Sequence, residues 1–336
     1  MATPYPIPVD STASRACTAR KMSSNCPPPL QPLPTLRGTL LLGGLAGTAA
    51  AQAPASADLW RLSAATLAGP AALESGASGA FWNPAAAWGQ SRIRIGAQVL
   101  QTPDVLGVTG LIAGASYRWS DAAAGQLLVG RTQVGDLVRT TTSPSSDLGS
   151  IPVYEQMVGV GAALRRGGLT GGALLRAHNA RFDADRDHGV TLDLGLRIAL
   201  PWASLAAATH FFPLDVESRD LPDYYAAAES QPASPSLWGT PGRLFLRYGV
   251  SVRRGSGVEH GGGLGLELDQ RFRLDAAVVR ETGYVDRATG QRETSWRPAV
   301  GVQLRVGRYA ITAARSSGLG GIGASYRIGL DVDALR

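Results

Sequence analysis

The sequence predicts an all-β fold, a transmembrane antiparallel β-barrel preceded by a short N-terminal hatch segment. Three observations support this class: segments of alternating aliphatic and polar residues run through most of the chain, an export leader precedes them, and aromatic residues stand at their ends. The segments are about nine to thirteen residues long, which is the length a tilted strand needs to cross a bilayer. Strands of a soluble secreted β-sandwich, the structural alternative, average about five or six residues.

Residues 1–51 are predicted to be a leader. Arg37 precedes an apolar run from Leu40 to Ala46, and small residues follow up to Ala51. This is the order of a secretory signal peptide, with cleavage expected after Ala51. The lead before Arg37 is long for a signal peptide, and a translation start at Met22 would leave one of normal length.

Charge and cysteine content exclude several classes of protein. The net charge is +6, the only lysine is Lys21, and acidic residues are interleaved with the arginines. Because no basic stripe forms, we expect no nucleic-acid partner. Both cysteines, Cys17 and Cys26, lie in the leader, so the mature chain would have no disulfide. No segment is long and apolar enough for a membrane helix, so a membrane-embedded chain must be embedded as strands.

Residues 52–90 are predicted to form a hatch or plug ahead of the barrel. Asn83 followed by Pro84 is a favourable helix entry, because Asn caps with its side chain and Pro is pre-set for the first helical position. Ala85 to Trp88 then favours about one helical turn. Gly and Ser residues before this turn supply a flexible approach, so the element could plug a lumen.

Residues 91–336 are predicted to form the barrel, and VTLDLGLRIAL, from Val190 to Leu200, is its clearest strand. Every second residue is aliphatic, so one face is hydrocarbon and the other carries both charge signs. In a membrane barrel the apolar face contacts lipid and the other lines the lumen. The charged residues predicted to line the lumen and pair across it are Asp193, Arg197, Arg247, Glu267, Arg273, Asp275, Arg297 and Arg305.

The number of strand-like segments does not match the number of strands expected for a barrel. We find thirteen segments, but both termini of a bacterial outer-membrane barrel normally lie on the periplasmic side, which requires an even number. A strand hidden in the Pro- and Ser-rich stretch 214–241, or just before Phe81, would give fourteen, and loss of a weak segment would give twelve. We favour fourteen. Aromatic residues predicted at the interfacial girdles are Trp119, Tyr154, Trp202, Phe211, Phe212, Tyr284, Trp296 and Tyr309.

Two short motifs resemble a known family. GAFWNPA, Gly79–Ala85, following a signal peptide and a Gly-rich lead, resembles the N-terminal segment of FadL-type outer-membrane transporters, and more closely that of their PorV-type relatives. GLGGIGASYRIGLDV, Gly318–Val332, is similar to the closing strand of the latter. The match covers about thirty residues at the start and fifteen at the end. The chain departs from the usual pattern by ending in Arg336 instead of an aromatic residue.

The resemblance implies a fourteen-stranded barrel in the bacterial outer membrane and passive passage of hydrophobic small molecules. Its implied hatch and gate positions are Phe81, Trp82, Asn83, Pro84 and Ala85. For PorV-type relatives it implies instead a part in protein secretion or surface attachment, with no solute flux. The expected partners are therefore outer-membrane lipid, and either hydrophobic small molecules or a secreted protein.

The sequence predicts no enzyme, no cofactor and no metal site. The four histidines, His178, His188, His210 and His260, do not form a pair spaced for zinc. DADRDHG, 183–189, resembles a calcium loop, but its Gly is one place late and Leu194 stands where a bidentate Glu belongs, so we interpret it as a polar hairpin tip. A lipid hydrolase with a Ser–His pair on the outer wall remains an alternative, although nothing resembles a nucleophile elbow.

Overall fold

The computed structural model describes residues 58–89, 91–102, 107–135, 137–138, 149–214, 221–237, 239–253, 257–285, 292–317 and 323–335. All of them belong to the second of two compact units, Ala51–Arg336. The predicted leader, 1–51, lies outside the described residues. None of the described helices is long and apolar enough to cross a membrane.

The N-terminal segment 58–89, called the hatch below, contains only short helices. They are α1 (Asp58–Ser63) and the 3-10 turns η1 (Ala64–Thr66), η2 (Ala71–Leu73), η3 (Ser78–Phe81) and η4 (Pro84–Ala87). The last turn begins as predicted, with Pro84 at its start and the Asn83 side chain accepting a hydrogen bond from Ala85 N.

Strands make up most of the remainder. They are β1 (Ile93–Gln101), β2 (Val108–Arg118), β3 (Ala123–Val134), β4 (Val153–Arg166), β5 (Leu169–Phe182), β6 (Asp185–Ala199), β7 (Ala203–Pro213), β8 (Asp223–Ser230), β9 (Ser236–Leu237), β10 (Thr240–Arg253), β11 (Gly257–Leu268), β12 (Phe272–Val285), β13 (Arg292–Val306), β14 (Tyr309–Ser317) and β15 (Ala324–Leu335).

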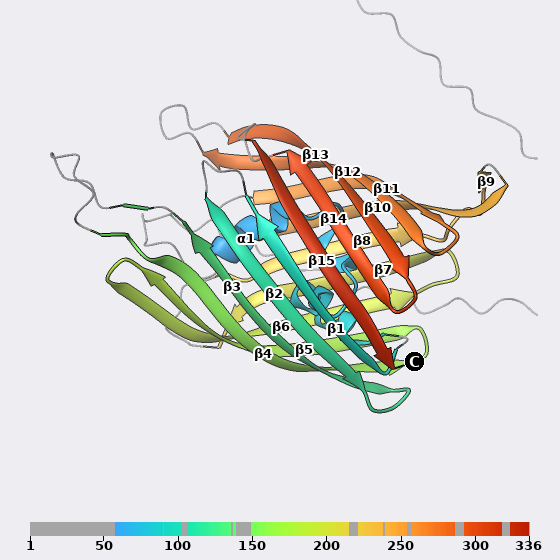
Figure 1. Ribbon diagram of the computed structural model, residues 1–336, viewed down its shortest axis with the longest axis horizontal. Helices are drawn as coiled ribbons and strands as arrows, with labels where there is room; N and C mark the ends of the chain where they lie inside the picture. The colour runs from blue at the N-terminus through green and yellow to red at the C-terminus, as the bar shows by residue number, and fades with distance from the viewer. Residues whose placement is uncertain are drawn as a thin grey trace, which may run out of the picture. The chain divides into compact units, whose positions relative to one another are not determined.

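These strands close into an antiparallel barrel (Figure 1). Each long strand pairs with its sequence neighbours, β8 pairs with β10, and β1 pairs with β15 to complete the ring. The two-residue strand β9 pairs only with the start of β10, so fourteen strands form the wall. The strand missing from the thirteen segments is β8, inside 214–241, and the prediction of fourteen is confirmed.

The aliphatic rows point out of the barrel. In β6, Val190, Leu194 and Leu196 are 41%, 45% and 39% exposed, whereas Asp193 between them is fully buried. The same alternation of exposed and buried positions runs through β1, β2, β4 and β15. In the part of the chain that the structure describes, no second sheet covers the exposed rows, so the sandwich alternative is excluded, and a hydrocarbon solvent accounts for them.

The two ends of the barrel differ. At the end where β1 begins and β15 finishes, connections such as Gly167–Gly168 and Gly307–Arg308 are tight, and a longer one, 231–239, connects β8 to β10. We call this the turn end. At the opposite end, called the loop end, longer stretches connect β3 to β4 (135–152) and β7 to β8 (214–222).

Exposed aromatic residues stand near both ends, with one correction to the predicted girdle. Trp119, Trp202, Phe212, Trp296 and Tyr309 are exposed, and Tyr154 is half-buried. The side chain of Tyr284 lies outside the described residues. Phe211 is only 4% exposed, because a bulge at a register shift between β6 and β7 gives it a positive φ of 57° and turns its ring inward.

Candidate functional site

The hatch runs inside the barrel from the loop end to the turn end. Arg61 of α1 forms an ion pair with Asp223, the first residue of β8 at the loop end, with a separation of 3.0 Å. At the other end of the hatch, the guanidinium groups of Arg118 and Arg165 lie 5.5 Å from the ring of Trp88. Figure 1 shows α1 and the following turns enclosed by the strands.

Asn83 organises the middle of the hatch. Its side-chain amide donates to Ala72 O at 2.8 Å, and its carbonyl accepts from Ala85 N at 3.0 Å. The turn is seated on two inward-facing glycines, Gly172 and Gly195, which are directly paired between β5 and β6. A Cβ at Gly172 would come within 2.6 Å of Ala85 N, so only glycine allows this close approach.

Arginines of the wall hold the hatch by its backbone. Short 3-10 turns leave many carbonyl groups without an internal partner, and each guanidinium offers five donors. Six wall arginines donate to hatch carbonyls: Arg118 to Gly89, Arg176 to Phe81, Arg197 to Ala72 and Glu74, Arg253 to Arg61, Arg297 to Ala65, and Arg327 to Ser63. The hatch is therefore bound to strands all round the barrel.

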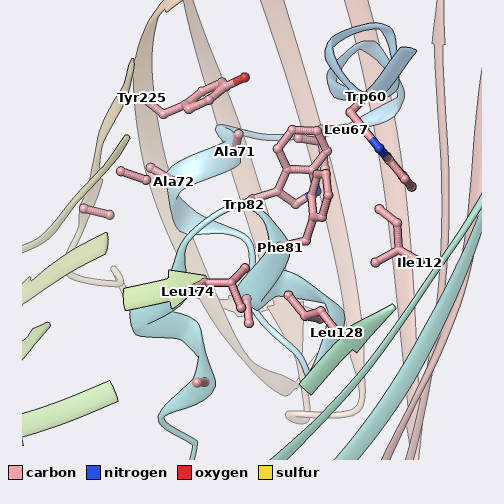
Figure 2. Packing of buried hydrophobic residues seen from close by; sticks show 14 of the residues in the cluster. Trp60, Leu67, Ala71, Ala72, Phe81, Trp82, Ile112, Leu128, Leu174 and Tyr225 are labelled. Atoms are coloured by element: carbon pink, nitrogen blue, oxygen red, sulfur yellow. The ribbon is translucent and has the colours of Figure 1, made fainter. Parts of the chain in front are cut away.

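An apolar cluster lies between the hatch and the side of the wall formed by β1 to β5. Figure 2 shows Trp60 and Phe81 of the hatch near Ile112 and Leu128 of the wall. Trp82 lies on the other side of the cluster, with its ring 6.3 Å from that of Tyr225. Leu100, Met157 and Leu174 belong to the same buried cluster. These wall residues occupy inward positions of β1 to β5. Only charged residues were predicted for the lumen face, and this apolar part of the wall was not predicted.

A buried ionic group lies beneath the apolar cluster. Arg176 pairs with Asp193, and its guanidinium lies between the rings of Phe81 (4.5 Å) and Phe211 (4.7 Å). Asp193 also accepts from Phe211 N at 2.7 Å, and His210 contacts Phe81 O through Nε2. The bulge thus supplies a donor to Asp193 while placing a ring on Arg176.

A cavity of about 440 Å³ lies at the turn end, between the hatch and the wall. Arg247 crosses it and contacts both Glu229 and Asp275 at 2.6 Å. Glu74 of the hatch also lines it. Burial raises the pKa of the Glu74 carboxyl above its ordinary value, against the attraction of nearby arginines, including Arg327.

The residues predicted as site residues occupy two places. The hatch residues Phe81, Trp82, Asn83, Pro84 and Ala85 are all buried inside the barrel. Of the eight predicted lumen charges, the cavity is lined by Arg197, Arg247, Arg273, Asp275 and Arg305. Asp193 and Arg297 are buried against the hatch, and Glu267 pairs with Arg243 near the turn end at 3.4 Å.

Sequence reasoning missed Arg176, Arg253 and Arg327. Arg327 sits between the outward residues Tyr326 and Ile328, so the alternation of β15 was a usable signal for it. Arg176 follows Leu174 on the inward face of β5. Because Leu174 is apolar, this face does not stand out as polar in the sequence, and Arg176 was not predicted to face the lumen. Among the described residues, no group of three or more His, Cys, Asp or Glu could hold a metal ion.

The closed wall, its exposed aliphatic rows and the internal hatch define the class: this chain is an outer-membrane β-barrel. The turn end, where β1 begins and β15 finishes, then faces the periplasm, and the loop end faces outside. No family model matches the chain, and no curated protein matches it.

Solved structures give distant similarities. The Pseudomonas putida toluene transporter TodX is 11% identical with a TM-score of 0.49, over 80% of this chain and 96% of that one. The outer membrane protein Omp33 of Acinetobacter baumannii is 10% identical with a TM-score of 0.41, over 72% and 97%. A mutant of the Rh. blastica porin is 10% identical with a TM-score of 0.38, over 71% and 98%.

Proposed function

We propose that this protein is a FadL-type passive transporter of hydrophobic small molecules, with the hatch as its gate. The observation that carries the proposal is the apolar surface of the wall that the hatch covers. Trp60, Phe81 and Trp82 belong to one buried cluster with the inward residues Leu100, Ile112, Leu128 and Met157 of the wall. If the hatch moved, a solute would meet this apolar part of the wall, formed by β1 to β4, and burial of an apolar solute there is favourable.

The way the hatch is held also supports a gate. Apart from the Arg61–Asp223 ion pair, many of its polar contacts with the wall are hydrogen bonds from arginine side chains to backbone carbonyls. Each such bond contributes only about 0.5–3 kcal/mol net, because water can replace it. The turn-end cavity of about 440 Å³ already has the volume of a small-molecule site. A shift of the hatch would join this cavity to the apolar part of the wall and complete a path.

Uptake of an apolar fluorescent dye by intact cells tests the proposal, because the outer membrane of such cells excludes the dye unless a protein admits it. We expect faster entry with the wild-type chain than without it. Gly195→Ala, which places a methyl group against Asn83, should raise uptake several-fold, and so should deletion of residues 58–89.

Gly171→Ala is the matched control, since a Cβ there meets nothing within 4 Å. Heat-modifiable gel mobility establishes that each variant is folded. Equal dye entry with and without the protein contradicts the transport proposal. Equal entry together with a stably co-purifying secreted protein would favour the PorV-like alternative.

A further inference from the structure

The outer wall carries a polar cluster that the transport proposal does not use. Tyr248 of β10, His260 of β11 and Arg280 of β12 occupy outward positions of neighbouring strands. The Tyr248 hydroxyl and His260 Nδ1 are 3.3 Å apart. Arg280 is paired directly with His260, and Trp296 of β13 is paired with Arg280. Four adjacent strands therefore place a phenol, an imidazole, a guanidinium and an indole side by side.

The cluster lies at the level where the bilayer interface begins. Trp296 is 65% exposed and Tyr248 is 51% exposed, and such aromatic residues mark membrane interfaces. Toward the turn end the next outward residues are apolar, with Val278 and Pro298 followed by Val300. Because the cluster is on the loop side of these residues, it faces the outer leaflet.

A row of small outward residues, called the notch below, adjoins the cluster. Gly262 lies between Tyr248 and Val278 in the ladder, on the outer face. A Cβ built at Gly262 would meet no side chain within 4 Å, only Arg247 O at 3.8 Å. In the next outward row, Ala276 is the small residue between Leu264 and Val300. The notch thus runs from the polar cluster toward the centre of the membrane.

Charge complementarity indicates what occupies this surface. Among the described residues at outward positions of β10 to β13, none is a carboxylate. Arg280 therefore has no acidic partner on its own face, although a cation beside hydrocarbon is favoured only when a headgroup or counter-charge is within reach. Guanidinium groups bind phosphate through two parallel hydrogen bonds, and imidazole and phenol groups add donors.

We propose that this surface binds an outer-leaflet lipid through its anionic phosphate headgroup. Arg280, His260 and Tyr248 contact the phosphate, and one acyl chain lies in the notch over Gly262. The site requires both parts of the lipid, which distinguishes it from a site for free phosphate and from general attraction between arginines and an anionic surface.

The test uses the mature full chain in phosphatidylcholine nanodiscs that contain either phosphatidic acid or diacylglycerol, its match without phosphate. Lipid retained by the protein is counted by native mass spectrometry. We expect selective retention of phosphatidic acid, and a loss of about tenfold or more in Arg280→Gln, as for removal of one charged hydrogen-bond donor. Arg131→Gln is the control, because Arg131 is also exposed on the loop half but lies over the Tyr154 ring, 4.5 Å from its centroid.

A second variant tests the notch. Gly262→Leu places a side chain over the notch from a position where the Cβ has open space, and should lower retention of phosphatidic acid while the barrel stays folded. Millimolar inorganic phosphate should not displace the lipid. Displacement by phosphate, equal retention of diacylglycerol, or equal losses in Arg280→Gln and Arg131→Gln would each overturn the proposal.

Discussion

Gly195 of β6 lies directly against the side chain of Asn83. An alanine methyl group at this position would overlap Asn83 Oδ1 and come within 2.9 Å of Ala85 N. The carbonyl of Asn83 is already engaged by Ala85 N, and its amide by Ala72 O. Asn83 therefore cannot move aside without losing its partners, so this position of the Asn83 side chain requires glycine at 195.

Asn83→Ala should loosen the hatch while leaving the wall intact. It removes a helix cap and a buried hydrogen bond to Ala72 O, which together contribute about 1–3 kcal/mol. Limited proteolysis of the detergent-solubilised barrel should show faster cleavage within the hatch. Ser120→Ala is the control. It removes an exposed hydrogen bond in which Ala122 N donates to Ser120 Oγ, and this variant should be cleaved at the same rate as the wild type. Equal cleavage rates in the two variants would contradict the role of Asn83.

Arg297→Gln should destabilise the folded barrel by about 3–5 kcal/mol, because it leaves the buried Glu281 without its partner. It also removes the hydrogen bond to Ala65 O of the hatch. Urea unfolding in lipid vesicles, followed by tryptophan fluorescence, measures the change. Arg271→Gln breaks an exposed pair with Asp269 and should cost less than about 1 kcal/mol.

The double variant Arg297→Met with Glu281→Leu measures how much of the loss in Arg297→Gln comes from the orphaned Glu281 carboxylate. It removes both charges together, so no buried ion is left unpaired, and the loss should be smaller than in Arg297→Gln. A double variant at least as unstable as the single one would show that the ion pair itself, and not the orphaned carboxylate, dominates.

Leu194→Arg should cost about 2–4 kcal/mol in the free energy of unfolding, because Leu194 faces the centre of the hydrocarbon layer. Val190→Arg lies on the same face of β6 but closer to the loop end, where the cost falls to about 0–1 kcal/mol. Equilibrium unfolding in vesicles compares the two variants. Equal costs at both positions would mean that lipid is not the solvent for this row.

Strand alternation made the wall predictable, and β8 shows where the signal fails. Around Tyr225, its inward and outward positions are both largely alanine, since Ala226 faces out and Ala227 faces in. A period of two is visible only when the two faces differ in polarity. The strand was placed by the requirement for an even count, which comes from topology and not from its own residues.

Alternation within a strand predicts which charged residues face the lumen, but it does not predict which of them pair. Asp193 pairs with Arg176, not with Arg197 on its own strand. The partner depends on the register between strands and on the bulge at Phe211, and neither can be inferred from the sequence of one strand. The hatch motif was recognisable around Asn83, but its attachment through backbone carbonyls was not, because any sequence offers carbonyls.

Arg327 belongs to β15, the last strand, yet it donates to Ser63 and Thr66, which precede the first. The same strand completes the ring by pairing with β1. During biogenesis, the plug therefore cannot be fully anchored until the final hairpin has been added. Closure of the ring and final attachment of the hatch therefore depend on the same strand, and a barrel without β15 would lack this anchor of the hatch.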